Sequence, residues 1–177
     1  FPKGIDDFRS SADMSTYADL HGDGSFEFIT GVSDSTFVKK KQEFPYEGNK
    51  KRANGPSEHR IYSPQSDFKM ELPLLFFNAH MFTTDLNRDG ADDIVFVQQG
   101  IDRPPWSLEW NYILISSEQK YELKRLPGKK SSFHGGTAGD IDNDGDIDII
   151  VVPGFENRVT AYINNGKGKF KLKTIAG

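Results

Sequence analysis

Short apolar runs rich in β-branched residues recur along the chain and are separated by polar stretches rich in Gly and Asp. Residues 28–31, 94–97 and 149–152 are three such runs. Runs of this length and composition are typical of buried strands. Residues 121–126 and 169–175 instead alternate apolar and polar side chains, as a strand with one solvated face does. The pattern therefore predicts an all-β protein.

The predicted strands fall into units of about four. In the last two units the apolar run is followed by a strand at residues 110–115 or 158–163 and then by an alternating strand, and a segment such as residues 133–139 precedes the unit's acidic loop. Apolar residues never persist at a spacing of three, four and seven, so we expect no helix. Four-stranded units in series predict β-propeller-type blades. We expect a single repeat domain over residues 1–177, with approximate units 1–78, 79–132 and 133–177.

An acidic loop precedes each apolar run, and the three loops share one pattern. They begin at Asp19, Asp85 and Asp140, each of which is numbered here as position 1 of its loop. Positions 1, 3, 5 and 9 are acidic or polar, position 2 is aliphatic, and position 6 is always Gly. The loops start roughly 66 and 55 residues apart, a spacing that fits blade-sized repeats.

Oxygen ligands at positions 1, 3 and 5, with Gly at position 6, describe a loop that binds a hard cation. An EF-hand would need Glu at position 12, but position 12 here lies in a predicted strand and the closing carboxylate is at position 9. A flexible loop with many carboxylates favours calcium over magnesium. The alternative is three solvated acidic turns, because Asp and Gly are ordinary turn residues. Three loops in register, each before a similar strand, favour calcium.

The three loops differ in the ligands that they offer. The third has carboxylates at all four ligand positions, so we expect it to bind calcium most tightly. The second has Asn87 at position 3 with Arg88 beside it, which predicts weaker binding. The first has His21 at position 3, a poor ligand for a hard ion, and is either a weak site or an empty loop held by hydrogen bonds. The candidate ligands of the first loop are Asp19, Asp23 and Glu27.

The third unit resembles an FG-GAP (VCBS-type) repeat, the blade of the integrin α-subunit propeller and of many bacterial secreted proteins. The resemblance rests on residues 133–154 and 159–166, is good in the second unit, and covers little of the first beyond residues 19–31. It implies calcium-binding propeller blades. The ligands that it implies are, in the third loop, the side chains of Asp140, Asp142, Asp144 and Asp148 with the carbonyl of Asp146, and, in the second loop, the side chains of Asp85, Asn87, Asp89 and Asp93 with the carbonyl of Ala91.

Three units are too few to close a propeller, which generally has four to eight blades. An open end exposes a sheet face that must be covered. We therefore expect this chain to be part of a longer propeller, to pair with another copy or subunit, or to contain blades that the pattern does not reveal. Two copies would supply six blades.

Composition excludes several classes of function. The chain of 177 residues has room for one domain with a core, and no apolar run approaches the ~20 residues of a membrane-spanning helix. The absence of Cys removes disulfides, zinc–thiolate sites and thiol catalysis. A formal net charge of −4 argues against a nucleic-acid-binding protein, which is usually basic. Neither a G-x-S-x-G elbow nor a phosphate-binding Gly-rich loop is present.

Two irregular insertions offer a candidate surface for a partner. Tyr46 lies between basic stretches, and Arg103 and Trp106 lie in a stretch with two Pro residues. Exposed aromatic and Arg side chains are common anchors of interfaces and of sugar stacking. An ordinary solvated loop is the favoured explanation of the first stretch. For the second stretch, which leads to Trp110, the alternative is that Trp110 belongs to the core, and the sequence favours neither.

These features favour a non-catalytic, calcium-stabilised module for binding or assembly, with a protein or glycan partner and an adhesion-like role. We expect it to be secreted, at the cell surface or in the periplasm, because cytosolic calcium is too scarce for weak loops of this kind. One alternative is a polysaccharide-active hydrolase or lyase on a propeller scaffold, and another is a structural subunit of a surface filament or complex. The candidate groups for the enzyme are Arg103, Tyr112, His80 and His134.

Overall fold

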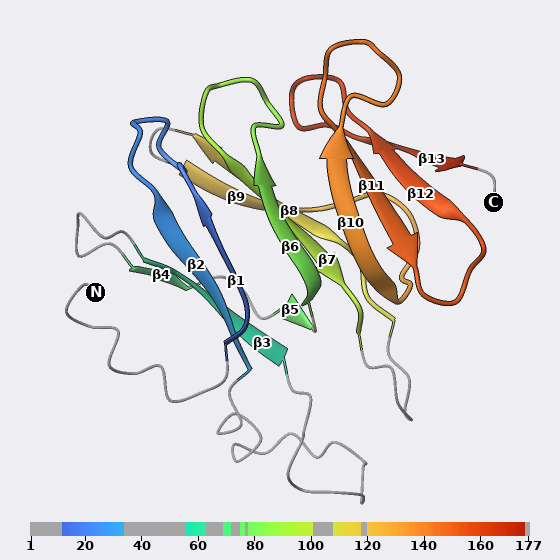
Figure 1. The fold of residues 1–177 in the computed structure, drawn as a ribbon, viewed down its shortest axis with the longest axis horizontal. Coiled ribbons are helices and arrows are strands. Elements are labelled where there is room, and N and C mark those ends of the chain that lie inside the picture. The colour runs from blue at the N-terminus through green and yellow to red at the C-terminus, as the bar shows by residue number, and fades with distance from the viewer. Residues whose placement is uncertain are drawn as a thin grey trace, which may run out of the picture.

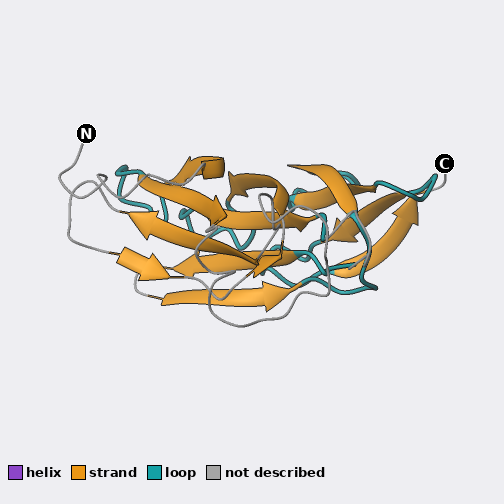
Figure 2. Ribbon diagram, turned by 90° about the horizontal axis from the view of Figure 1, so that it is seen from below, coloured by secondary structure: helices purple, strands orange, loops and turns teal. Residues whose placement is uncertain are grey.

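The structure of the protein is a computed structural model. It describes residues 12–33, 56–62, 69–71, 75–76, 78–100, 108–117 and 120–175. Within these ranges all regular structure is β, and Figures 1 and 2 show strands joined by loops without a helix. No helix in these ranges is long and apolar enough to cross a membrane. The all-β prediction is confirmed.

The strands form three antiparallel sheets, which follow one another along the chain. The first sheet contains β1 (Ala12–Ala18), β2 (Glu27–Ser33), β3 (Pro56–Tyr62), β4 (Lys69–Glu71) and β5 (Leu75–Phe76). The second contains β6 (Asn78–Thr84), β7 (Asp93–Gln98), β8 (Tyr112–Ser117) and β9 (Lys120–Arg125). The third contains β10 (Phe133–Gly139), β11 (Asp148–Pro153), β12 (Val159–Ile163) and β13 (Lys171–Ile175).

Each sheet is a meander in which chain neighbours pair, as expected for a propeller-type blade. The second and third sheets run in the order β6-β7-β8-β9 and β10-β11-β12-β13. The first sheet runs β1-β2-β3-β4 and has a fifth short strand, because β5 pairs with the beginning of β3. The sequence pattern did not separate this small strand from the irregular connection around it.

The three sheets stack in a row with the second sheet in the middle, as the fan of ribbons in Figure 1 shows. Strand β7 is buried along its whole length, because Ile94 and Phe96 face the first sheet while Val95 and Val97 face the third. The core between the first and second sheets consists of Ala18, Leu20, Ile29, Ile61, Met81, Ile94, Phe96 and Leu114. The core between the second and third consists of Leu86, Val95, Val97, Ile113, Leu126, Phe133, Ile149, Val151 and Tyr162.

The first strands of the three sheets, β1, β6 and β10, lie side by side (Figure 1). Gly136 of β10 marks how closely β10 packs in this arrangement. A Cβ added there would lie 2.8 Å from the backbone oxygen of Ile150 and 3.1 Å from Cγ2 of Val97 in the second sheet. Only a residue without a side chain allows this approach.

Both ends of the row present apolar side chains to solvent. On the far face of the first sheet, Tyr17, Phe26 and Phe28 are 65%, 52% and 37% exposed. Phe28 stands at position 10 after Asp19, and the same position in the second sheet is Ile94, which is buried against the first sheet. On the far face of the third sheet Val152 is 46% exposed. The described residues therefore form an open row of blades.

Candidate metal-binding loops

The three acidic loops join the first and second strands of their sheets and project from the same edge of the molecule (Figure 1). They share an unusual backbone with positive φ at positions 4 and 6. At position 6 the values are 82° for Gly24, 88° for Gly90 and 88° for Gly145. At position 4 they are 67° for Gly22, 61° for Arg88 and 60° for Asn143. The sequence pointed to position 6, but it did not reveal position 4, where three different residue types adopt the same left-handed conformation.

The carboxylate at position 1 closes each loop. It accepts a hydrogen bond from the backbone N–H of the Gly at position 6, at N–O distances of 2.7, 2.9 and 3.0 Å in the first, second and third loops. The carboxylate at position 5 likewise accepts from the N–H of position 7, at 2.8, 3.0 and 2.8 Å. The bond at position 5 is that of an Asx turn. In the first and second loops the position-1 carboxylate uses both oxygens, because Asp19 Oδ1 also accepts from the N–H of Asp23 and Asp85 Oδ1 from that of Arg88.

The carboxylate at position 9 is buried and ties the loop to its sheet. One oxygen of Asp148 accepts from the backbone N–H of Ile141 at 3.0 Å, and the other accepts from the N–H of Asn164 at 2.8 Å. Asp93 makes the matching bonds to Leu86 and Ser116, both at 2.8 Å. Asn164 directly follows β12, and Ser116 lies next to the last residue of β8. Each of these is the third strand of its sheet, so this carboxylate holds three strands in place.

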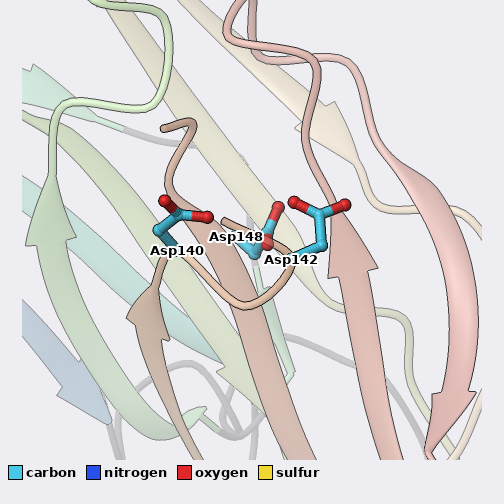
Figure 3. Close-up of side chains that lie close together, drawn as sticks. All are labelled: Asp140, Asp142 and Asp148. Carbon is cyan, nitrogen blue, oxygen red and sulfur yellow. The ribbon is translucent and has the colours of Figure 1, made fainter. Parts of the chain in front are cut away.

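The third loop brings its acidic side chains together. Asp140, Asp142 and Asp148 each offer an oxygen, and these oxygens lie within 4.8 Å of one another around the bend between β10 and β11 (Figure 3). Desolvation raises the pKa of Asp142 above 3.8, and the charges of neighbouring carboxylates, Asp144 first, add to the rise. An oxygen-only cluster of like charges matches the donor set of a hard cation, so these residues fit calcium.

The second loop is less open to an ion. The side-chain amide of Asn87 donates to Asp89 Oδ2 at 2.9 Å and to the backbone oxygen of Ser116 at 3.4 Å, so the loop is partly closed on itself. Burial raises the pKa of Asp93 to about 6, although the N–H groups that it accepts from oppose the rise. A cation beside Asp93 would offset this cost of burying a carboxylate.

The first loop departs from the other two at positions 3 and 9. His21 Nε2 lies 3.0 Å from Tyr121 Oη, which belongs to β9 of the second sheet, and 4.0 Å from Glu27 Oε1. Glu27 is 1% exposed and accepts a hydrogen bond from the N–H of Leu20 at 3.0 Å. In the described part of the chain, the His, Asp and Glu side chains converge as a group of three or more at the third loop, and at neither the first nor the second.

Contacts between neighbouring loops were not foreseen from the sequence. Asp19 and Asp92 are joined by two hydrogen bonds. The backbone N–H of Asp92 donates to the backbone oxygen of Asp19 at 2.7 Å, and the backbone N–H of Asp19 donates to Asp92 Oδ2 at 3.0 Å. Arg88 of the second loop reaches the third, where its guanidinium contacts the carbonyl of Gly145 and pairs with Asp146 at 2.9 Å. The loops therefore form one connected edge.

The role of Asn164 was also not predicted from the sequence. Its amide donates to the carbonyl of Leu86 in the second loop at 2.7 Å and to that of Ile147 in the third at 2.9 Å. The only signal was its place in a hairpin turn, between β12 and β13. The turn residue thus also links two sheets.

The remaining candidate residues lie partly outside the described part of the chain. Tyr46, Arg103 and Trp106, proposed as a ligand surface, lie outside the described residues. His80 packs near Phe82 with ring centroids 5.6 Å apart, and His134 packs near Phe155 at 6.0 Å. Trp110, which the sequence left between core and interface, is half-buried and lies under the cationic groups of Arg125 and Lys130, at 4.7 and 4.3 Å from its ring centroid.

Comparison with known proteins gives one positive result. Residues 140–177 match the FG-GAP-like repeat family, and this match begins at the third loop and covers the rest of the third sheet. No curated protein matches the chain. The match agrees with the resemblance of the third unit and with the propeller-type sheets.

Proposed function

We propose that this chain is a calcium-stabilised, non-catalytic module for binding or assembly, built from propeller-type blades. The observation that carries this proposal is the convergence of three carboxylates in the third loop, inside the segment that matches the FG-GAP-like repeat. The three units, close to 1–78, 79–132 and 133–177, would each contribute one blade and one loop.

The residues that would hold calcium come from the second and third loops. An ion bound there supplies positive charge that neutralises the repulsion among the carboxylates. Asp142 is exposed, so its side chain makes no contribution to the buried core. Asp148 instead contributes an oxygen to the cluster and also holds the loop by its hydrogen bonds. The proposed ligands are the side chains of Asp140, Asp142, Asp144 and Asp148 with the carbonyl of Asp146, and those of Asp85, Asn87, Asp89 and Asp93 with the carbonyl of Ala91.

The strength of such sites favours a location outside the cytoplasm. Extracellular calcium modules have dissociation constants of ~10⁻⁴ to 10⁻³ M. At millimolar calcium, binding to the folded state then adds about 0.5–1.5 kcal/mol per site to the free energy of unfolding. Calcium bound with this affinity would stabilise the fold only where the surrounding fluid contains millimolar calcium at all times. We therefore assign the protein to a secreted, cell-surface or periplasmic setting.

The open sheet faces support an assembly role. Val152 stands at position 13 of the third unit, and the same position in the second unit is Val97, which is buried against the third sheet. Val152 and Phe28 therefore occupy positions that a neighbouring blade covers elsewhere in this chain. Neighbouring blades of a longer propeller or a second copy would cover these faces, and a protein or glycan partner would bind to the completed module in an adhesion-like role.

Two measurements on the full chain test the two halves of this proposal. Thermal unfolding in calcium chloride and in chelator tests the metal, because a melting temperature that does not respond to saturating calcium would contradict it. Light scattering after size exclusion, under the same two conditions, tests the assembly. A dimer or larger species supports blade pairing between copies, whereas a compact monomer in both conditions excludes self-assembly as the way in which the faces are covered.

A further inference from the structure

The first loop has the shape of the other two without their set of oxygen ligands. Its position-1 carboxylate, Asp19, accepts from the N–H of Gly24 at 2.7 Å, and its position-9 carboxylate, Glu27, accepts from the N–H of Leu20 at 3.0 Å. Its φ angles at positions 4 and 6, 67° and 82°, also follow the shared pattern. The hydrogen bonds of positions 1 and 9 therefore form this loop whatever residue stands at position 3.

The side chain at position 3 is directed away from a metal role. The imidazole of His21 lies edge-on to the ring of Tyr121, with centroids 5.9 Å apart, and its Nε2 is 3.0 Å from the tyrosine hydroxyl. Burial raises the pKa of Tyr121 to about 12, and the charge of Glu27 adds to the rise, so the hydroxyl stays protonated at neutral pH. A protonated phenol is a hydrogen-bond partner for the imidazole and is no ligand for calcium.

The closing carboxylate also lies near the imidazole. Glu27 Oε1 lies 4.0 Å from His21 Nε2, and the side chain of Glu27 is buried. In the second and third loops the corresponding oxygen accepts a backbone N–H from the end of the third strand, at 2.8 Å in both. The imidazole therefore lies beside the buried carboxylate that closes the first loop.

We propose that His21 replaces calcium in the first loop: its imidazole lies beside Glu27 and contacts the hydroxyl of Tyr121, so that this loop binds no metal and fastens the first sheet to the second. Imidazole offers nitrogen where a hard cation prefers oxygen. The inference rests on the calcium role proposed for the other two loops, from which the first loop is the exception.

A gain of binding tests the role of His21 directly. The His21→Asp variant restores a carboxylate at position 3, and isothermal titration of the full chain with calcium chloride should then show one more site than the wild type, with a dissociation constant of ~10⁻⁴ to 10⁻³ M. His21→Ala is the matched control, because it removes the imidazole without supplying a ligand, and it should gain no site. Equal numbers of sites in His21→Asp and in the wild type would overturn the assignment.

A second variant keeps the test decisive if His21→Asp folds poorly. Asp23 is exposed, and its loss should leave the fold intact. Asp23→Ala should not change the number of calcium sites in the wild type, whereas in the His21→Asp background it should remove the gained site. A wild-type chain that loses a site on Asp23→Ala contains a working first loop, and that result would refute the proposal.

The contact between His21 and the hydroxyl of Tyr121 is tested by a separate variant. Tyr121→Phe keeps the ring and removes the hydroxyl, and it should lower the melting temperature by about 2–4 °C, equally in calcium and in chelator. A lower melting temperature seen only in calcium would contradict a contact that involves no metal. If the wild type binds no calcium at all, the proposed function fails, while the gain of a site in His21→Asp still reports on the first loop alone.

Discussion

Removing one of two carboxylates in the third loop separates the structural role of this loop from its proposed metal role. Asp142 and Asp148 both contribute an oxygen to the same cluster, but Asp142 is exposed whereas Asp148 is fully buried. Asp148→Ala leaves the N–H groups of Ile141 and Asn164 without their acceptor. Each unpaired buried donor costs about 1–3 kcal/mol, so the loss of both should cost this variant about 2–6 kcal/mol even in chelator.

Asp142→Ala should behave differently in the same buffers. In chelator it should leave the free energy of unfolding nearly unchanged, because the side chain is exposed and its neighbours are like charges. In about 10 mM calcium a site of extracellular strength adds about 1.4–2.7 kcal/mol, and both variants should lose that contribution from the third loop.

Urea unfolding followed by circular dichroism, in calcium and in chelator, measures both terms. Asp148→Asn is a useful intermediate, because it keeps one acceptor oxygen and places an N–H₂ group against the other donor. Equal losses for Asp142→Ala and Asp148→Ala in chelator would refute the structural role of position 9. An undiminished calcium response in Asp142→Ala would refute the ligand set of the third loop.

Three further predictions follow from single contacts. Gly136→Ala should lose about 1–3 kcal/mol in a thermal melt, because its new Cβ would meet Ile150 O at 2.8 Å, whereas Gly139→Ala, with no atom within 4 Å, should be neutral or slightly stabilising. Arg88→Asn removes the positive charge that pairs with Asp146, and Asn tolerates the φ of 61° at this position. Calcium binding by the third loop should therefore tighten a few-fold at low salt and less at high salt, whereas the control Arg88→Lys keeps the charge. Burial raises the pKa of Asp93 in the folded protein to about 6, so ionisation of this carboxyl destabilises the fold in chelator. The free energy of unfolding should therefore fall by roughly 2–3 kcal/mol as pH rises from about 4 past 6, and Asp93→Asn should abolish this fall in urea titrations.

The strands and loops of the second and third units could be predicted because their signals are local. The run at residues 149–152 lies inside β11, and the run at residues 94–97 lies inside β7. Asn165 and Gly166 form a pair that is typical of hairpin turns, and they lie between β12 and β13. In each case the residues that determine the element are its own side chains and those of the adjoining turn.

Contacts between sheets could not be predicted in the same way. The buried carboxylate of Asp93 is bonded to Ser116, 23 residues further on, whereas that of Asp148 is bonded to Asn164, only 16 residues further on. The connections between the second and third strands differ in length, so no common spacing in the sequence marks the two partners as equivalent. Their equivalence is visible only in space.

The sequence by itself determined the fold class, the register of the three acidic loops and the oxygen-rich donor sets of the second and third. These properties depend on residues a few positions apart, where backbone geometry leaves few choices. The tertiary structure decided how the loops join into one edge: Arg88 reaches the third loop, and His21 turns toward Tyr121, a residue 100 positions away. Such contacts depend on how whole sheets stack, because packing brings together residues whose distance along the chain carries no information about their distance in space.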